Sequence, residues 1–263
     1  MSAPLRIASV GALGRMGERV RAAVADADDA ELAGALESPG HPGLGAEVAP
    51  GVRVVDDPAR AFANATVAID FSVPSATRPA LQAAAAAGVA YVCGTTGFSA
   101  AERAELDAAA SRIPIVWSPS FSVAVNVLAH LVAAAARLLG PDFDAEIVEV
   151  HHAAKRDAPS GTALRLAEAV AQARGQDLAK VLVATREGEV GARPAGVIGV
   201  QSLRGGDNPG EHSVFFLGRG ERLELVHRTT TRDHFAAGAL RAARGLRGRA
   251  PGLYSIDEVL GLS

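Results

Sequence analysis

The sequence predicts an α/β fold, in which an N-terminal doubly wound parallel sheet is followed by a second, α+β domain with a mostly antiparallel (mixed) sheet. Two observations support this prediction. Over the first 122 residues, short apolar runs alternate with Ala-rich amphipathic segments, as in parallel strands joined by crossover helices. After Ser122, one long helical segment is followed by several separate strand-like runs, a pattern typical of an α+β layer.

The first domain, residues 1–122, is expected to alternate strands with helices from its start. Each strand is assigned to a short apolar run and each helix to a longer Ala-rich segment with one apolar face. The expected strands cover 6–10, 31–37, 67–71, 90–93 and 115–117, and the expected helices cover 17–27, 76–87 and 100–110.

The second domain is expected over residues 123–232 and begins with a helix over 125–139. Helical segments at 233–245 and 254–262 are expected to return to the first domain. Between the helix at 125–139 and the segment at 233–245, we expect one further helix that starts near Ala163. The same interval contains strand-like runs around Ile147, Val181, Val197, Val214 and Leu223.

Composition limits the class of function. The chain has 263 residues and a formal net charge of −3, which provides no overall attraction to nucleic acid or to an anionic membrane surface. The single cysteine, Cys93, excludes an intrachain disulfide and a multi-cysteine metal site. The first ten residues lack the features of a secretory signal, and no run is a convincing membrane span. We therefore expect a cytoplasmic protein whose partner is a small molecule.

The most informative segment is Glu149-Val-His-His-Ala-Ala-Lys-Arg-Asp-Ala-Pro-Ser-Gly-Thr-Ala163. It follows an apolar run and precedes a helix that Ser160 or Thr162 can cap, so its charged residues lie in a strand-to-helix loop. The free N–H groups of this helix start, at Gly161 and Thr162, can receive a carboxylate, and Lys155 adds a full positive charge. The segment predicts carboxylate recognition coupled to proton transfer.

These residues also have plain structural interpretations. A surface lysine is commonly a solvated charge, and adjacent histidines in a loop are commonly exposed or hydrogen-bonded. A metal site made of His151, His152 and Asp157 is conceivable, but adjacent loop histidines do not by themselves set a tetrahedral geometry. We expect no metal, and the joint spacing of the residues is what favours a functional site.

A glycine-rich turn joins the first expected strand to the first helix. Gly11, Gly14 and Gly17 form a GxxGxxG pattern, with Leu13 where a dinucleotide-binding loop commonly has its second glycine. A tight turn that ends in a helix N-terminus suits a pyrophosphate, so the segment predicts a Rossmann-like cofactor site. An ordinary structural turn fits the motif equally well.

Glu37 ends the second expected strand about twenty residues after the glycine loop, where an acidic side chain commonly binds the adenosine ribose. The next residue is Ser38, so a 2′-phosphate would meet the Glu37 charge without an adjacent arginine. This favours NADH over NADPH and leaves use of both open. The alternative is a solvated acid at a strand end.

Two further loops follow expected strands at their carboxyl ends, which is the ligand side of an open parallel sheet. They are therefore placed to hold the nicotinamide half of a cofactor, although each alone would also be an ordinary turn. The loops are Gly94-Thr95-Thr96-Gly97 and Ser118-Pro119-Ser120-Phe121.

Three separated motifs, at 10–17, 94–97 and 149–163, together resemble the dihydrodipicolinate reductase family. The resemblance covers nearly the whole chain and includes 121–126, 210–212 and 231–232. It implies reduction of 4-hydroxy-tetrahydrodipicolinate, via dihydrodipicolinate, to tetrahydrodipicolinate with NADH or NADPH in the diaminopimelate route to lysine. The implied substrate is a small dicarboxylate cyclic imine, and the implied assembly is a homotetramer formed through the second domain.

The resemblance also implies roles by position. His151 would give or accept a proton and Lys155 would donate one, because hydride addition to a conjugated imine leaves negative charge that an acid must quench. The substrate binders would be His152, Gly161, Thr162 and Arg232. The cofactor binders would be Gly11, Ala12, Leu13, Gly14, Arg15, Met16, Glu37, Gly94, Thr95, Thr96, Ser118, Pro119, Ser120 and Phe121.

Some features depart from the family pattern or leave alternatives open. Some members have an additional basic residue where Ala153 or Ala154 stands and an arginine where Ser38 stands, and asparagine is common at the position of Ser120. One alternative is another Rossmann dehydrogenase that acts on a small carboxylate. The other is a non-catalytic NAD(H)-sensing module, which would bind the cofactor without turnover.

Overall fold

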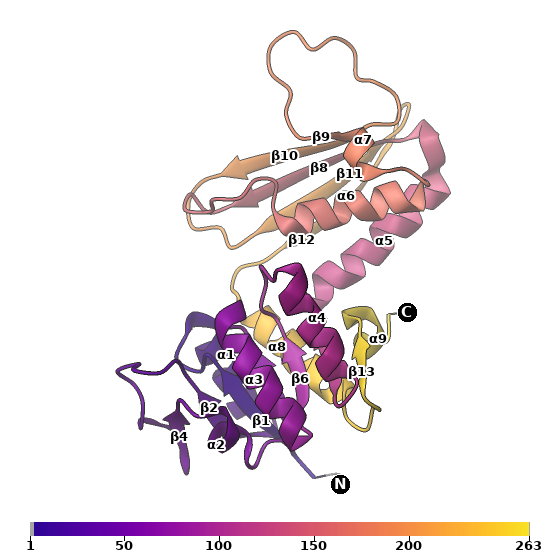
Figure 1. Cartoon of the computed structure of the whole chain (residues 1–263). Helices are drawn as coiled ribbons and strands as arrows, with labels where there is room; N and C mark the ends of the chain where they lie inside the picture. Colours follow the sequence, from indigo (N-terminus) through magenta and orange to yellow (C-terminus); the bar gives the residue numbers. More distant parts are fainter. Residues whose placement is uncertain (1–2, 263) are drawn as a thin grey trace. The chain divides into compact units, whose positions relative to one another are not determined.

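A computed structural model describes residues 3–262 of the chain (Figure 1). The chain forms two compact units, each with its own sheet. The first unit combines the chain up to Val123 with the chain from Arg232 onward, and the second unit is Ala124–Thr231. The sheets and their helices confirm the predicted α/β fold class.

The first unit contains an eight-stranded sheet in the order β13-β7-β6-β5-β1-β2-β4-β3. Its neighbouring strands run parallel, except for the antiparallel pair β3 and β4. The strands are β1 (Leu5–Val10), β2 (Ala30–Leu36), β3 (Glu47–Ala49), β4 (Val52–Val55), β5 (Val67–Asp70), β6 (Ala90–Cys93), β7 (Pro114–Trp117) and β13 (Gly252–Tyr254).

Helices cover both faces of this sheet because successive strand residues point to opposite sides. Ile7 belongs to the core cluster that includes residues of α1, α8 and α9, whereas its neighbour Ala8 belongs to the cluster that includes residues of α2, α3 and α4. The helices are α1 (Arg15–Ala25), α2 (Pro58–Phe62), α3 (Pro74–Ala87), α4 (Ala100–Ala110), α8 (Asp233–Gly245) and α9 (Ile256–Leu260).

The second unit contains a five-stranded mixed sheet in the order β12-β11-β8-β10-β9. The pairs β8–β11 and β11–β12 are antiparallel, and the pairs β8–β10 and β10–β9 are parallel. The strands are β8 (Asp144–His151), β9 (Leu182–Val183), β10 (Ile198–Arg204), β11 (Glu211–Leu217) and β12 (Arg222–Arg228), and the helices are α5 (Val123–Leu139), α6 (Gly161–Ala173) and α7 (Leu178–Val181).

One face of this sheet forms the core of the second unit. Ile147 of β8, Val200 of β10 and Val214 of β11 are fully buried and pack with apolar residues of α5 and α6. Residues 123–142, which include α5, are apolar and long enough to span a membrane by length and composition alone. The buried side of α5 instead contributes to this core, as expected of a helix in a folded domain.

Several element boundaries differ from the sequence expectations. Val181 ends the short helix α7, which Asp177 caps, and the neighbouring strand β9 has only two residues. Tyr254 belongs to β13, not to a helix, because residues 252–254 pair with the edge strand β7. Three further elements, β3, β4 and α2, fill the interval between β2 and β5, where the sequence predicted none.

Candidate functional site

The loop after β8 carries most of the predicted site residues. β8 ends at His151, and α6 begins at Gly161. Ser160 caps the helix, because its Oγ accepts a 3.1 Å hydrogen bond from the Ala163 N–H. Of the two possible caps, the structure therefore selects Ser160. Gly161 and Thr162 form the first turn, where backbone N–H groups have no partner within the helix.

Glu149 and His151 are two residues apart on β8 and therefore point to the same face of the sheet. His151 Nδ1 lies 2.5 Å from Glu149 Oε2, and the Glu149 side chain is fully buried. Arg204, at the end of β10, donates one 2.8 Å hydrogen bond to each Glu149 oxygen. The Ser160 N–H adds a 3.0 Å bond to Oε1, so both oxygens of this carboxylate accept hydrogen bonds.

The protonation states follow from these contacts. Burial alone would raise the pKa of Glu149, but hydrogen bonds from Arg204, Ser202, His151 and Ser160 outweigh it and lower this pKa to about 2. Burial lowers the pKa of His151, and the charges of Lys155 and Arg204 act in the same direction against the pull of Glu149. An ionised carboxylate only accepts hydrogen bonds, so a neutral His151 carries its proton on Nδ1.

A second histidine lies beside this pair. The His212 ring meets the His151 ring edge to face, with 5.2 Å between their centroids, and His212 Nε2 lies 3.0 Å from Ser160 Oγ. Burial is the largest cause that lowers the pKa of His212 to about 3, with the positive charge of a protonated His151 acting in the same direction. His212 is therefore a neutral wall of the site at physiological pH.

Lys155 and His152 lie in the loop beyond the strand. Lys155 Nζ donates bonds of 2.8 and 2.9 Å to the two oxygens of Asp157, and this pairing is the main cause that lowers the pKa of Asp157. The Lys155 side chain is only 19% exposed, whereas that of Asp157 is 62% exposed. The backbone N–H of His152 donates to the Asn208 carbonyl, which ties the loop to the segment between β10 and β11.

The glycine loop of the first unit is tightly turned. Gly11 has φ +67, a left-handed conformation that favours glycine, and Gly14 precedes α1 in an extended conformation. A Cβ on Gly17 would lie 2.1 Å from the Gly11 carbonyl oxygen, so α1 can approach the turn only with glycine there. This geometry fits a pyrophosphate, which needs a tight turn and a helix N-terminus aimed at it.

Glu37 lies directly after β2 and touches the glycine loop. Its carboxylate accepts a 3.0 Å hydrogen bond from Leu13 N–H and bonds of 2.9 and 3.2 Å from Ser38 N–H and Oγ. Burial opposes ionisation, but these hydrogen bonds prevail and the pKa of Glu37 is lowered. The structure thus places a charged acid beside the loop, where a ribose would lie next to a bound pyrophosphate.

The loops after β6 and β7 lie at the same edge of the sheet as the glycine loop, since all these strands are parallel. Gly94 packs under the Phe71 ring, where a Cβ would come within 2.3 Å. The side chains of Thr95 and Phe121 are buried, whereas Thr96 and Pro119 are exposed. Thr95 and Phe121 can therefore face a ligand mainly through their backbone.

The structure gathers the predicted residues into two groups. Those assigned to the cofactor lie in the first unit, and His151, His152, Lys155, Gly161 and Thr162 lie together around the end of β8 in the second. Arg232 immediately precedes α8 and belongs to the first unit, although we expected it to end the second domain. No group of three His, Cys, Asp or Glu residues that could hold a metal occurs among residues 3–262.

Sequence reasoning missed three polar residues. Arg204 has no local motif, and its signal lies in the register that sets it opposite His151 in the parallel strand β10. Asp70, at the end of β5, is fully buried and accepts hydrogen bonds from Tyr91 OH and from Ser72 N–H. His212 lay within a matching segment of the family but was given no role.

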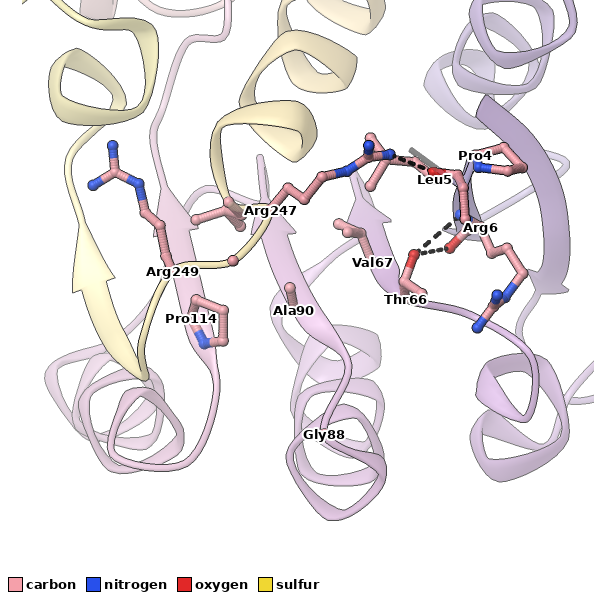
Figure 2. Close-up of a pocket in the computed structure, with 13 residues that line it drawn as sticks. Pro4, Leu5, Arg6, Thr66, Val67, Gly88, Ala90, Pro114, Arg247 and Arg249 are labelled. Carbon is pink, nitrogen blue, oxygen red and sulfur yellow. Dashed lines mark hydrogen bonds between the residues drawn. The ribbon is translucent and has the colours of Figure 1, made fainter. Parts of the chain in front are cut away.

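A hollow of about 450 Å³ occupies the opposite edge of the first sheet, at the amino ends of its strands (Figure 2). Arg6, Arg247 and Arg249 line it, and each donates a hydrogen bond to a backbone carbonyl. Ligands of open parallel sheets bind at the carboxyl ends of the strands. This hollow therefore does not belong to the candidate site.

Comparison with known proteins agrees with this geometry. Residues 5–121 match the family model of the dihydrodipicolinate reductase N-terminus, and residues 124–260 match that of its C-terminus. A 4-hydroxy-tetrahydrodipicolinate reductase of Anaeromyxobacter sp. (strain Fw109-5) is 51% identical, with 98% of each chain covered. The corresponding enzyme of Myxococcus xanthus (strain DK1622) is 47% identical, again over 98% of each chain.

Among solved structures, the dipicolinate-bound dihydrodipicolinate reductase from Paenisporosarcina sp. TG-14 has the same fold. The TM-score is 0.78 at 22% identity, with 97% of this chain and 98% of that chain covered. The two family models together span nearly all of the residues that build both units. The chain therefore belongs to the dihydrodipicolinate reductase family of nicotinamide-dependent oxidoreductases.

Proposed function

We propose that the protein reduces 4-hydroxy-tetrahydrodipicolinate, via dihydrodipicolinate, to tetrahydrodipicolinate in the diaminopimelate route to lysine, with residues 149–163 supplying the proton-transfer site. The family membership supports the reaction. The observation that carries the site is the arrangement after β8, where a neutral His151 backed by Glu149 shares one loop with the Lys155 ammonium. NADH or NADPH supplies the hydride when bound.

Lys155 is the proton donor in this proposal. His151 holds its proton on Nδ1 against Glu149, so its outer nitrogen has no proton to give. The Lys155 ammonium is held by the exposed Asp157 carboxylate, a partner that a substrate carboxylate can replace. The Lys155 ammonium then transfers a proton to the reduced ring and so neutralises the negative charge that develops there.

Substrate carboxylates are assigned to the start of α6. The backbone N–H groups of Gly161 and Thr162 and the partial positive charge of the helix end favour an anion. A Cβ on Gly161 would meet no atom within 4 Å, so the approach to this turn is open. His152 adds an imidazole to the same loop, and Arg232 is proposed as a further carboxylate contact.

The cofactor is proposed to lie along the carboxyl edge of the first sheet, with NADH preferred over NADPH. Gly11 to Met16 would hold the pyrophosphate, because Gly11 makes the turn and Gly14 leads into α1. Glu37 is held in place by the Leu13 N–H and would accept hydrogen bonds from ribose hydroxyls. The same charge would repel a 2′-phosphate, and Ser38 offers no cation in compensation.

The decisive assay follows loss of NADH or NADPH absorbance with substrate generated from pyruvate and aspartate semialdehyde by the preceding synthase. Wild type and Lys155→Ala are compared with Lys180→Ala, which removes an 81% exposed lysine from α7. We expect turnover by wild type and Lys180→Ala and a fall in kcat of roughly 100-fold or more for Lys155→Ala, as for loss of a general acid.

Equal activity of Lys155→Ala and Lys180→Ala would rule out Lys155 as the proton donor. Absence of turnover by the wild type with both cofactors, despite measurable NADH binding, would favour another dehydrogenase reaction or a sensing module. Circular dichroism on each variant shows whether the protein is folded, and so whether a loss of activity comes from the missing side chain or from unfolding.

A further inference from the structure

Arg204 stands behind the Glu149–His151 pair on the strand next to β8. The parallel register sets Arg204 opposite His151, so its guanidinium reaches the Glu149 carboxylate from the side. Its Nη2 also donates a 2.7 Å hydrogen bond to the Asp157 carbonyl, in the loop that holds Lys155. One side chain thereby connects β8, β10 and the loop after β8.

We propose that Arg204 is a positioning residue that fixes Glu149 as an acceptor, so that His151 keeps its proton on Nδ1 and presents an unprotonated Nε2 to the substrate. This proposal rests on the proposed function. Arg204 acts through Glu149 and has no proposed contact with the substrate itself.

The hydrogen bonds around Glu149 explain how the imidazole is fixed. Oε2 of Glu149 accepts hydrogen bonds from His151 Nδ1 and Arg204 Nη1. Oε1 accepts them from Ser160 N–H and Arg204 Nη2. With donors on both oxygens the carboxylate cannot turn away from the ring. A planar guanidinium is suited to this task because its two N–H groups match the two carboxylate oxygens.

Gly210 leaves room for the other side of the ring, which is 10% exposed. A Cβ built on Gly210 would lie 3.0 Å from His151 Nε2, and the φ of +153 at this position also disfavours other residues. The charged and titratable groups around His151 are Glu149, Arg204, Lys155 and His212. Nε2 thus lies beside a position where a side chain would press on the ring.

A matched control exists at another glutamate of β8. Arg186 also donates two 2.8 Å hydrogen bonds to a glutamate of β8, Glu146, three residues before Glu149. Glu146 points to the opposite face of the sheet from the site and has Arg193 as a second partner. Loss of Arg186 therefore removes an equivalent ion pair without touching the imidazole.

The test compares Arg204→Gln, Arg204→Lys and Arg186→Gln by steady-state kinetics across pH. For Arg204→Gln we expect kcat to fall roughly 10- to 100-fold with little change in KM. Losses of this size follow in metalloenzymes when the hydrogen-bond partner behind a metal-binding histidine is removed, and His151 is held by Glu149 in a comparable way. The acid limb of kcat/KM should shift to higher pH, because a positive charge that opposes protonation of His151 is gone. Arg204→Lys should recover part of kcat, and Arg186→Gln should leave the acid limb of kcat/KM at its wild-type position, because its ion pair does not contact His151.

A second readout does not require turnover. Nitrogen-15 spectra of the histidine rings, with His151 assigned by comparison with His151→Asn, should show the Nδ1–H tautomer in wild type and a mixture in Arg204→Gln. An Nε2–H tautomer in wild type, or identical His151 signals and pH limbs in both proteins, would overturn the proposal. If Arg204→Gln does not fold, Arg204→Lys and Glu149→Gln provide the same comparison. Failure of the proposed reaction would leave these spectra interpretable.

Discussion

At the residue scale, two acids of the candidate site keep their negative charge through directed hydrogen bonds. Glu149 accepts hydrogen bonds from Arg204, Ser202, His151 and Ser160 inside the second unit. Glu37 accepts hydrogen bonds from Leu13 and Ser38 beside the glycine loop. In both cases burial opposes the charge and the donors overcome it, which lowers both pKa values. The two acids therefore stay ionised at neutral pH, one behind a histidine and the other at the proposed ribose position.

The Glu37→Ala substitution should weaken the binding of NADH more than the binding of NADPH. The variant loses hydrogen bonds to the ribose hydroxyls for both cofactors, but for NADPH it also removes repulsion of the 2′-phosphate. We expect the Kd for NADH to rise roughly tenfold, about 1.4 kcal/mol. Fluorescence titration measures both constants, with Glu31→Ala, an exposed acid on β2, as the control. Equal losses for both cofactors would contradict the ribose assignment.

At the element scale, close backbone contacts position the loops that carry the candidate site. Gly17 lets α1 approach the turn at Gly11, and Gly238 lets α8 approach the loop that ends β7. A Cβ on Gly238 would lie 1.8 Å from the carbonyl oxygen of Phe121. Since Phe121 is fully buried, that backbone has little room to move.

Gly238→Ala should destabilise the protein even though alanine normally favours a helix over glycine by about 1 kcal/mol. Overpacking against a buried carbonyl costs about 1–3 kcal/mol, which outweighs the helical gain. Urea unfolding measures the change in free energy of unfolding. Ala237→Gly, at an exposed neighbouring position of α8, reports helix propensity alone. If the Gly238→Ala protein is more stable than wild type, α8 and the Phe121 carbonyl can move apart at little cost, which would contradict this prediction.

At the scale of the whole molecule, the second sheet has one face covered by helices and one open face. The open face includes Leu203, Leu217 and Val226, which are 49%, 37% and 39% exposed. The register pairs Leu203 with Val150 and Val226 with Ser213, so these side chains share that face. Exposed apolar side chains that gather on one sheet face commonly mark a contact between subunits, which fits the homotetramer that the family resemblance implies.

The double variant Leu217→Glu and Val226→Glu should shift the assembly to smaller species. Burying a carboxylate in a subunit contact costs desolvation and so opposes association. The effect should therefore exceed that of Leu138→Glu, which alters an 81% exposed residue of α5. Sedimentation velocity should give the mass of four 26.8 kDa chains for wild type and for Leu138→Glu. A wild-type monomer, or an unchanged tetramer in the double variant, would contradict the proposed interface.

The sequence predicted the elements whose signals are local. The strands at 67–71 and 90–93 and the helix at 100–110 appear as β5, β6 and α4, because apolar runs and amphipathic periodicity depend on neighbouring residues. It missed β13, whose three residues are a strand only because they pair with β7. It also read Val181 as a strand, where the Asp177 cap starts a short helix.

The sequence by itself determined the family, the glycine turn and the loop of residues 149–163, because each depends on residue types at fixed spacing along the chain. Only the tertiary structure decided how these residues are held. Arg204 lies 55 residues from Glu149 in the chain and His212 lies 52 from Ser160, yet both pairs are hydrogen-bonded. The pairing of strands brings such distant residues together, and it thereby sets the orientation of the His151 imidazole, which the sequence motif could not give.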